Sequence, residues 1–74
     1  MNNIRKVVIG REYTKDAMSY SVGQRVYRGQ YEIDCIVEEE GRIIIYIEKD
    51  GEIFSWKEIN EYVPFILEYS LDFS

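Results

Sequence analysis

The side chains that most often carry out catalysis are scarce in this sequence. It contains one cysteine, Cys35, no histidine and 14 acidic residues. A lone cysteine can complete neither a metal site nor an intramolecular disulfide, and no glycine-rich loop leads into a helix as phosphate binding would require. Glu38 and Glu40 suggest an acid and a base, but both fall on a solvated turn without the burial that prepares carboxylates for proton transfer. We therefore expect a protein that is not an enzyme and that uses no cofactor and no metal.

Basic and aromatic residues alternate in the first third of the chain. Residues 1–28 hold six basic residues against two acidic ones, a net charge of +4, and the remainder holds three against twelve, a net charge of −9. Small barrels often bind nucleic acid through cations and stacking rings. The residues that would do so here are Arg11, Tyr13, Lys15, Tyr20, Arg25, Tyr27 and Arg28.

The overall charge opposes this use, because a chain with a pI of about 4.6 repels phosphates. Nucleic-acid binding is therefore the second hypothesis, beside the inverse idea that the acidic face mimics nucleic acid. The two charged halves could equally pack together and pair within one domain.

The segment from Val22 to Glu58 predicts an antiparallel meander, since glycines at 29, 41 and 51 mark three reversals. Residues 31–38 alternate as a half-buried strand with Cys35 facing the core. A three-residue loop over residues 39–41 would set Ile33 opposite Ile47. A two-residue loop would set Ile33 opposite Glu48 instead, burying a carboxylate at a cost of roughly several kcal/mol, so the longer loop is favoured.

Asp50 and Gly51 are the strongest hairpin signal, because both central positions of a type I′ turn need positive φ. With this pair as the loop, Ile47 meets Phe54 and Ile45 meets Trp56, so both rings are expected to point into the core. A three-residue loop would instead expose the two rings as an aromatic patch.

The ends of the chain predict two further strands. Ile4 to Ile9 is short and β-branched, and should close against the chain end. The alternation from Tyr62 to Phe73 favours a strand over a helix, because Pro64 would cost a helix interior about 3 kcal/mol.

The remaining segments connect these strands. We expect a long ordered loop from Gly10 to Ser21 and a short strand from Val22 to Tyr27. The pattern Ser55-Trp56-Lys57-Glu58 fits a capping box, which predicts a single helical turn from Trp56 to Glu61 with Ile59 facing in.

This order of elements resembles the SH3-like small barrels. The resemblance rests on residues 22–27, the loop 39–41, Asp50-Gly51, and residues 55–59 before the final strand. It implies a mainly β fold: one domain over residues 1–74, an antiparallel barrel of five to six strands with one short helical turn before the last. The sequence lacks the signature of proline-peptide-binding SH3 domains, so their ligand is not implied. The brevity and acidity also resemble small accessory proteins encoded by phages and other mobile elements.

The registers above leave a row of apolar residues on the face away from the core, which is typical of an interface or of a face covered by the loop and termini. The row comprises Ile36, Ile44, Tyr46, Ile53 and Ile66. Our first hypothesis is therefore a non-enzymatic protein-interaction module that binds an unknown protein partner or a second copy of itself, and could act as an inhibitor of a host protein.

No membrane is expected as a partner. Residues 4–9 are too short and too charged for a signal peptide, and no apolar run approaches the roughly 20 residues of a membrane span. With a single cysteine as well, a cytoplasmic location is expected.

A salt titration separates the two hypotheses. Nucleic-acid binding would give a DNA affinity that falls steeply with salt and is lost when Arg25→Ala is combined with Arg28→Ala. We expect no such affinity in fluorescence anisotropy with single-stranded and duplex DNA, and its appearance would reverse the ranking.

Overall fold

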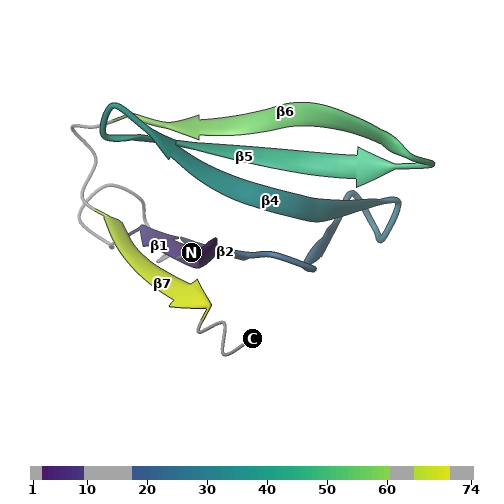
Figure 1. Cartoon of the computed structure of the whole chain (residues 1–74). Helices are drawn as coiled ribbons and strands as arrows, with labels where there is room; N and C mark the ends of the chain where they lie inside the picture. Colours follow the sequence, from purple (N-terminus) through teal and green to yellow (C-terminus); the bar gives the residue numbers. More distant parts are fainter. Residues whose placement is uncertain (1–2, 10–17, 61–64, 71–74) are drawn as a thin grey trace.

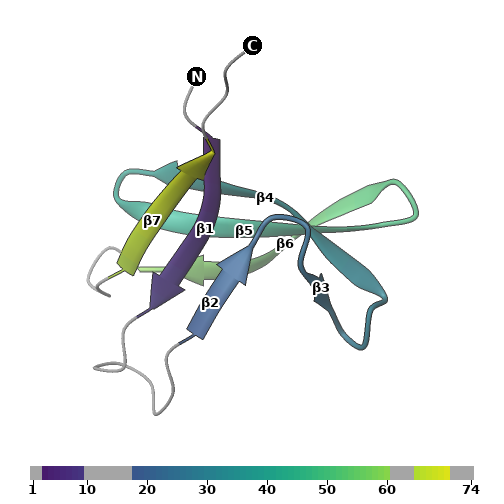
Figure 2. The same cartoon turned by 90° about the horizontal axis from the view of Figure 1, so that it is seen from below.

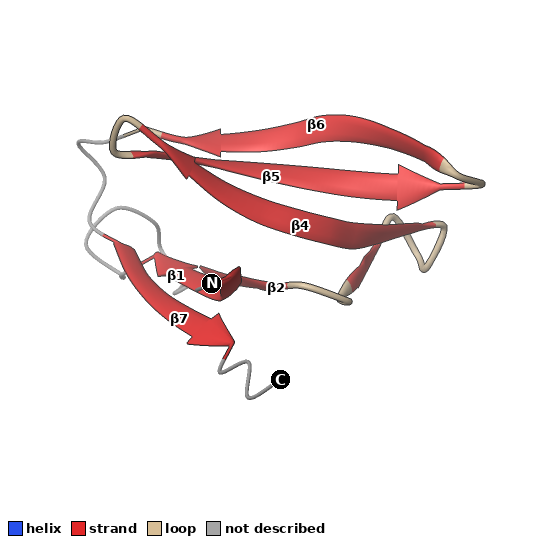
Figure 3. Cartoon of the chain, viewed as in Figure 1, coloured by secondary structure: helices blue, strands red, loops and turns tan. Residues whose placement is uncertain are grey.

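The computed structural model describes residues 3–9, 18–60 and 65–70, and these form an antiparallel β-sheet (Figure 1). The strands are β1 (Asn3–Ile9), β2 (Met18–Ser21), β3 (Arg25–Val26), β4 (Tyr31–Glu39), β5 (Arg42–Lys49), β6 (Glu52–Ile59) and β7 (Phe65–Ser70). The prediction of a mainly β fold is confirmed, and Figure 3 shows no helix in the described part of the chain. No helix in these ranges could span a membrane.

The sheet curls so that its two halves face each other, which makes a half-barrel. Strands β4, β5 and β6 form the upper half in Figure 1, and β7, β1 and β2 form the lower half. Figure 2 shows the lower strands running across the direction of the upper ones. The halves join where Ile4 of β1 pairs with Ile36 of β4, and where β3 pairs with the start of β4.

The core lies between the halves and is built mostly from β-branched side chains. Its buried members are Val7, Ile9, Tyr20, Ile33, Ile36, Ile43, Ile45, Ile47 and Ile59. Alternate residues of β5 supply the centre, because Ile43, Ile45 and Ile47 all point to one face of the strand. The prediction that these three face inward is confirmed, as is the inward position of Ile59.

The β4–β5 hairpin differs from the predicted register. Its loop has two residues, Glu40 and Gly41, with φ of 51° and 81°, so Glu39 rather than Glu38 pairs with Arg42. The charge burial that disfavoured this loop does not occur, because a β-bulge in β4 shifts the pairing and still sets Ile33 opposite Ile47.

The bulge explains why one isoleucine interrupts the polar row of β4. The extra residue, Asp34, is exposed, so Ile33 and Ile36 lie three residues apart yet both face the core. Cys35 consequently pairs with Tyr46 and is only half-buried, so its predicted position on the inward face is wrong.

The β5–β6 hairpin has the predicted turn, with φ of 53° at Asp50 and 83° at Gly51. Ile47 pairs with Phe54 as expected. Beyond that pair a second bulge sets Ile45 opposite Lys57 and leaves Trp56 as the extra residue. The predicted helical turn is wrong, because residues 56–59 continue β6 and pair with β5 instead of capping a helix.

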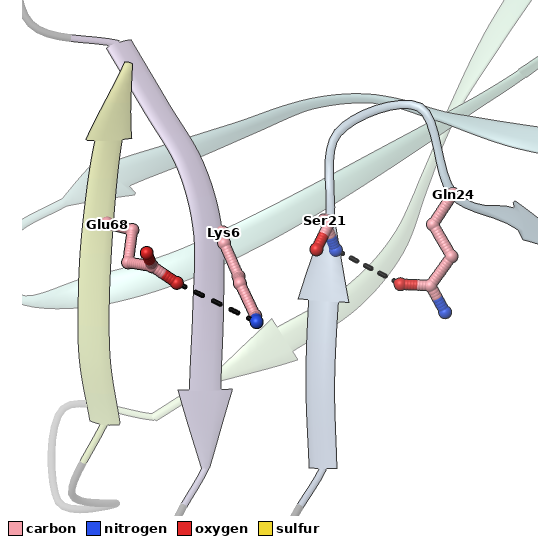
Figure 4. A network of polar contacts seen from close by, with 4 residues as sticks. All are labelled: Lys6, Ser21, Gln24 and Glu68. Carbon is pink, nitrogen blue, oxygen red and sulfur yellow. Dashed lines mark hydrogen bonds and ion pairs between the residues drawn. The ribbon is translucent and has the colours of Figure 1, made fainter. Parts of the chain in front are cut away.

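The lower half is organised around β1. It pairs with β7, as predicted for a strand that closes against the chain end, and with β2 on its other side. Residues 18–21 were expected in a loop but form β2, while 10–17 lie outside the described residues. Lys6 of β1 reaches Glu68 of β7 at 3.7 Å on the exposed face (Figure 4).

The crossing from β2 to β3 is held by hydrogen bonds on both sides. The Ser21 N–H donates to Oε1 of Gln24 at 3.1 Å (Figure 4), and the Gln24 N–H donates back to the Ser21 carbonyl at 3.0 Å. The Ile33 N–H donates to the Gln24 carbonyl at 2.8 Å. These bonds anchor the chain to β4 just before β3. The strand predicted over residues 22–27 is shorter in the structure and covers only Arg25–Val26, because residues 22 and 23 form a turn.

Truncating the core should destabilise the fold far more than truncating the outer surface. We expect Ile45→Ala to lower the free energy of unfolding by about 2–5 kcal/mol, because the lost contacts leave a cavity between the halves. The matched change Ile66→Ala, at a side chain that is 69% exposed, should cost less than about 0.5 kcal/mol. Urea unfolding followed by circular dichroism measures both. Equal losses would contradict the assignment of the core.

Candidate binding groove

An open groove lies toward the end of the upper half at which β4 begins and β5 leads into β6 (Figure 1). Its volume is about 410 Å³. Four of its described lining residues are aromatic, and the described lining comprises Tyr27, Gln30, Tyr31, Ile47, Phe54, Ser55 and Trp56. We call this the aromatic groove.

Strand pairing places three of the four rings. Tyr31 opens β4 opposite Val26, and Phe54 lies opposite Ile47 next to the β5–β6 turn. Trp56 is the bulged residue of β6, and its side chain packs against the core cluster. Without that extra residue, strict alternation along β6 would not leave both Phe54 and Ile59 on the core side.

The fourth ring, Tyr27, is placed by an unusual turn. Tyr27, Arg28 and Gly29 have φ of 53°, 58° and 86°, so two bulky residues occupy the left-handed region. N–H groups of Gly29 and Gln30 donate to carbonyls three residues earlier, at 3.2 Å each. The Arg25 guanidinium donates to the Gly29 carbonyl at 3.0 Å. Such conformations persist only where surrounding contacts enforce them, and they cluster at ligand-binding sites.

The rings contact one another edge to face. Tyr27 lies 5.4 Å from Tyr31 and 6.1 Å from Trp56 between ring centroids, with interplanar angles of 69° and 66°. Tyr31 lies 6.4 Å from Phe54 at 74°. The Trp56 Nε1–H donates to the Tyr27 hydroxyl at 2.9 Å. Neighbouring rings are therefore steeply inclined to one another and do not stack face to face.

Two lysines of the chain lie over these rings. The Lys49 ammonium is 5.2 Å from the centroid of Tyr31, and the Lys57 ammonium is 4.9 Å from that of Trp56. Both distances are within the range of cation–π attraction. The ring faces at this end of the molecule already attract positive charge.

The predicted outer row of apolar residues is not a single surface. Ile36 is 4% exposed and belongs to the core, because the β4 bulge turns it inward, so its assignment to a partner surface is wrong. Ile44 and Tyr46 are half-buried on the face away from the core, and Ile53 is exposed on the neighbouring strand. Ile66 is exposed on β7, which belongs to the other half-sheet.

The predicted nucleic-acid residues separate as well. Arg11, Tyr13 and Lys15 lie outside the described residues. Tyr20 is buried in the core, where its ring meets Trp56 edge to face at 5.5 Å, so its assignment as a stacking platform is wrong. The remaining three, Arg25, Tyr27 and Arg28, are exposed together at β3 and the turn that follows. Of the nine candidate residues that lie in the described part of the chain, only Tyr27 lines the aromatic groove.

Sequence reasoning missed the groove because it placed Phe54 and Trp56 in the core. Phe54 is 45% exposed although it lies on the core side of β6, since the end of the hairpin extends past the lower half. Trp56 is half-buried and packs against the core, which confirms its inward direction. One feature of the sequence could have revealed the bulge. Phe54 and Ile59 are five positions apart, and two residues of one strand at an odd separation can both face inward only if a bulge lies between them.

The other candidate chemical groups do not converge. Burial raises the pKa of the Cys35 thiol, and a hydrogen bond and the charge of Asp34 add to the effect. This thiol lies on β4 opposite Tyr46. Glu38 and Glu40 are exposed. Within the described ranges, no three histidine, cysteine, aspartate or glutamate side chains lie close enough to hold a metal ion.

Comparison of the chain with protein-family models, with curated proteins and with solved structures gives no match.

The hydrogen bond between the two largest rings should be measurable in solution. In Tyr27→Phe the Trp56 indole N–H loses its acceptor while both rings stay in place, so its hydrogen exchange should accelerate by about tenfold at nearly unchanged stability. Proton NMR of the single tryptophan reports this directly. An exchange rate equal to that of the wild type would show that the Tyr27 hydroxyl does not accept a hydrogen bond from the indole N–H.

Proposed function

We propose that this protein is a binding module of SH3-like small-barrel architecture that takes up an extended segment of a partner protein in the aromatic groove. The observation that carries the proposal is the convergence of four aromatic side chains from the β3–β4 turn, β4 and β6 around one open groove. Aromatic rings provide large contact areas at low conformational cost and dominate the energetics of protein recognition.

The lining favours binding over chemistry. The described groove residues that are not aromatic are Gln30, Ile47 and Ser55. Gln30 and Ser55 provide polar side chains, and Ile47 provides an apolar one. A mainly apolar groove with a few polar groups is typical of recognition sites. Tyr27 at 57% exposure and Phe54 at 45% leave apolar ring surface in water, and a ligand would cover that surface.

The architecture is compatible with this use. The pairing of β1 with β7 and the β4–β5–β6 meander are compatible with a small barrel, although the helical turn that the SH3-like resemblance implies is replaced by the end of β6. The strained turn at Tyr27 supports the proposal further, because a ring held ready before binding reduces the ordering cost.

A nucleic acid is the second candidate occupant, and one observation favours it. Arg25 and Arg28 flank Tyr27 in the sequence, and all three side chains are exposed. Against this, the chain carries a net charge of −5, and phosphate contacts dominate nucleic-acid affinity.

Selection from a random peptide library displayed on phage tests the proposed function. We expect enriched peptides to change the fluorescence of Trp56, the sole tryptophan, and to bind Tyr27→Ala about tenfold or more weakly, as hot-spot aromatic residues do. Tyr69→Ala is the matched control, because Tyr69 is 46% exposed but lies on β7 in the other half.

The proposal fails if enriched peptides bind wild type and Tyr27→Ala equally. It also fails if no peptide is enriched while single-stranded DNA changes the Trp56 fluorescence. Circular dichroism of each variant ensures that a loss of binding is not a loss of fold.

A further inference from the structure

We propose that the aromatic groove recognises an alkylated ammonium group, such as a trimethylammonium, carried by the partner segment. This inference rests on the proposed function and specifies the chemistry of the ligand. It is drawn from three features of the groove: the arrangement of its rings, the cations already held by those rings, and the lack of acidic residues in its described lining.

Neighbouring rings of the aromatic groove do not lie parallel to one another. Tyr27 stands steeply to both Tyr31 and Trp56, and Tyr31 stands steeply to Phe54. Rings inclined in this way offer no pair of parallel faces between which a flat ligand could be sandwiched. A roughly spherical group can instead contact several differently oriented rings at once.

The charge of that group is indicated by the chain's own lysines. The ammonium groups of Lys49 and Lys57 lie over Tyr31 and Trp56, where the negative face of each ring attracts a cation. The field of the whole molecule acts in the same direction, because its net charge is −5. The attraction of the ring faces and the negative net charge favour a cationic ligand over a neutral or an anionic one, and Lys49 and Lys57 compete with that ligand for the Tyr31 and Trp56 rings.

The lining then distinguishes among cations. A bare ammonium brings three N–H donors and a guanidinium brings five, and each loses free energy when its donors are desolvated without acceptors. None of the described lining residues is an aspartate or glutamate; Gln30 and Ser55 are the only ones that carry neither an aromatic nor an aliphatic side chain. A trimethylammonium has no N–H donor to satisfy and presents methyl groups to the rings, so it matches this lining best.

The size of the groove is consistent with such a ligand. At about 410 Å³ it lies within the range of small-molecule sites. It can therefore hold an alkylated ammonium together with part of the aliphatic chain that carries it.

Titrations monitored through Trp56 fluorescence test this inference. The ligands are N-acetyl-Nε-trimethyllysine amide, the corresponding unmodified lysine amide, and the neutral isostere that carries a tert-butyl group in place of the trimethylammonium, all at constant ionic strength. We expect saturable binding of the trimethylated compound, at least about tenfold tighter than either comparison ligand.

Three variants sharpen the test. Phe54→Ala should weaken the binding of the trimethylated amide by about tenfold, while Tyr69→Ala, of matched exposure on β7, should leave it unchanged. Lys49→Gln removes a like charge that lies 5.2 Å from the Tyr31 centroid, so it should tighten the binding. Chemical shifts of the Trp56 indole N–H provide a second readout that does not depend on quenching.

Equal affinity for the neutral isostere would overturn the inference, because it would show a hydrophobic site without cation selectivity. Weaker binding by Lys49→Gln, or undiminished binding by Phe54→Ala, would overturn it as well. If the peptide selection gives ligands that depend on Tyr27 while the trimethylated amide shows no preference, the proposed function stands and this inference alone fails.

Discussion

Three β-bulges in the described strands determine which of their side chains meet in the interior of the protein. In β4, β6 and β1 an additional residue interrupts the pairing with the neighbouring strand. Each bulge lets apolar residues at irregular spacings share the core face, and each increases the local bend of its strand. A chain of 74 residues can therefore fold its sheet over itself and enclose a small, dense core.

The same constraint creates the aromatic groove. The β6 bulge turns Trp56 toward Tyr20 and Tyr27, while the hairpin end beyond it extends past the lower half and leaves Phe54 partly in water. The left-handed turn brings the Tyr27 hydroxyl within 2.9 Å of the indole nitrogen of Trp56, which donates a hydrogen bond to it. Rigid strands thus hold three of the rings, and a hydrogen-bonded turn holds the fourth.

Local signals in the sequence were sufficient for the class of fold and for one of the two tight hairpins. Asp50 and Gly51 fixed their turn because few residues tolerate positive φ at both positions. The β4–β5 loop was misassigned because strict alternation was assumed, and that assumption hid the bulge at Asp34. The error moved Ile36 from the core to a surface, and with it the predicted interface. The groove was missed for a different reason, because the exposure of Phe54 depends on the tertiary placement of the hairpin end.

The account depends on the side of β6 from which the Trp56 ring projects. Nuclear Overhauser effects in the folded chain measure this directly, because such effects arise only between protons that lie close together. We predict cross-peaks from the indole of Trp56 to the rings of Tyr20 and Tyr27, whose centroids lie 5.5 and 6.1 Å away. Cross-peaks to Ile44 and Tyr46 on the opposite face, with none to Tyr27, would contradict both the bulge and the groove.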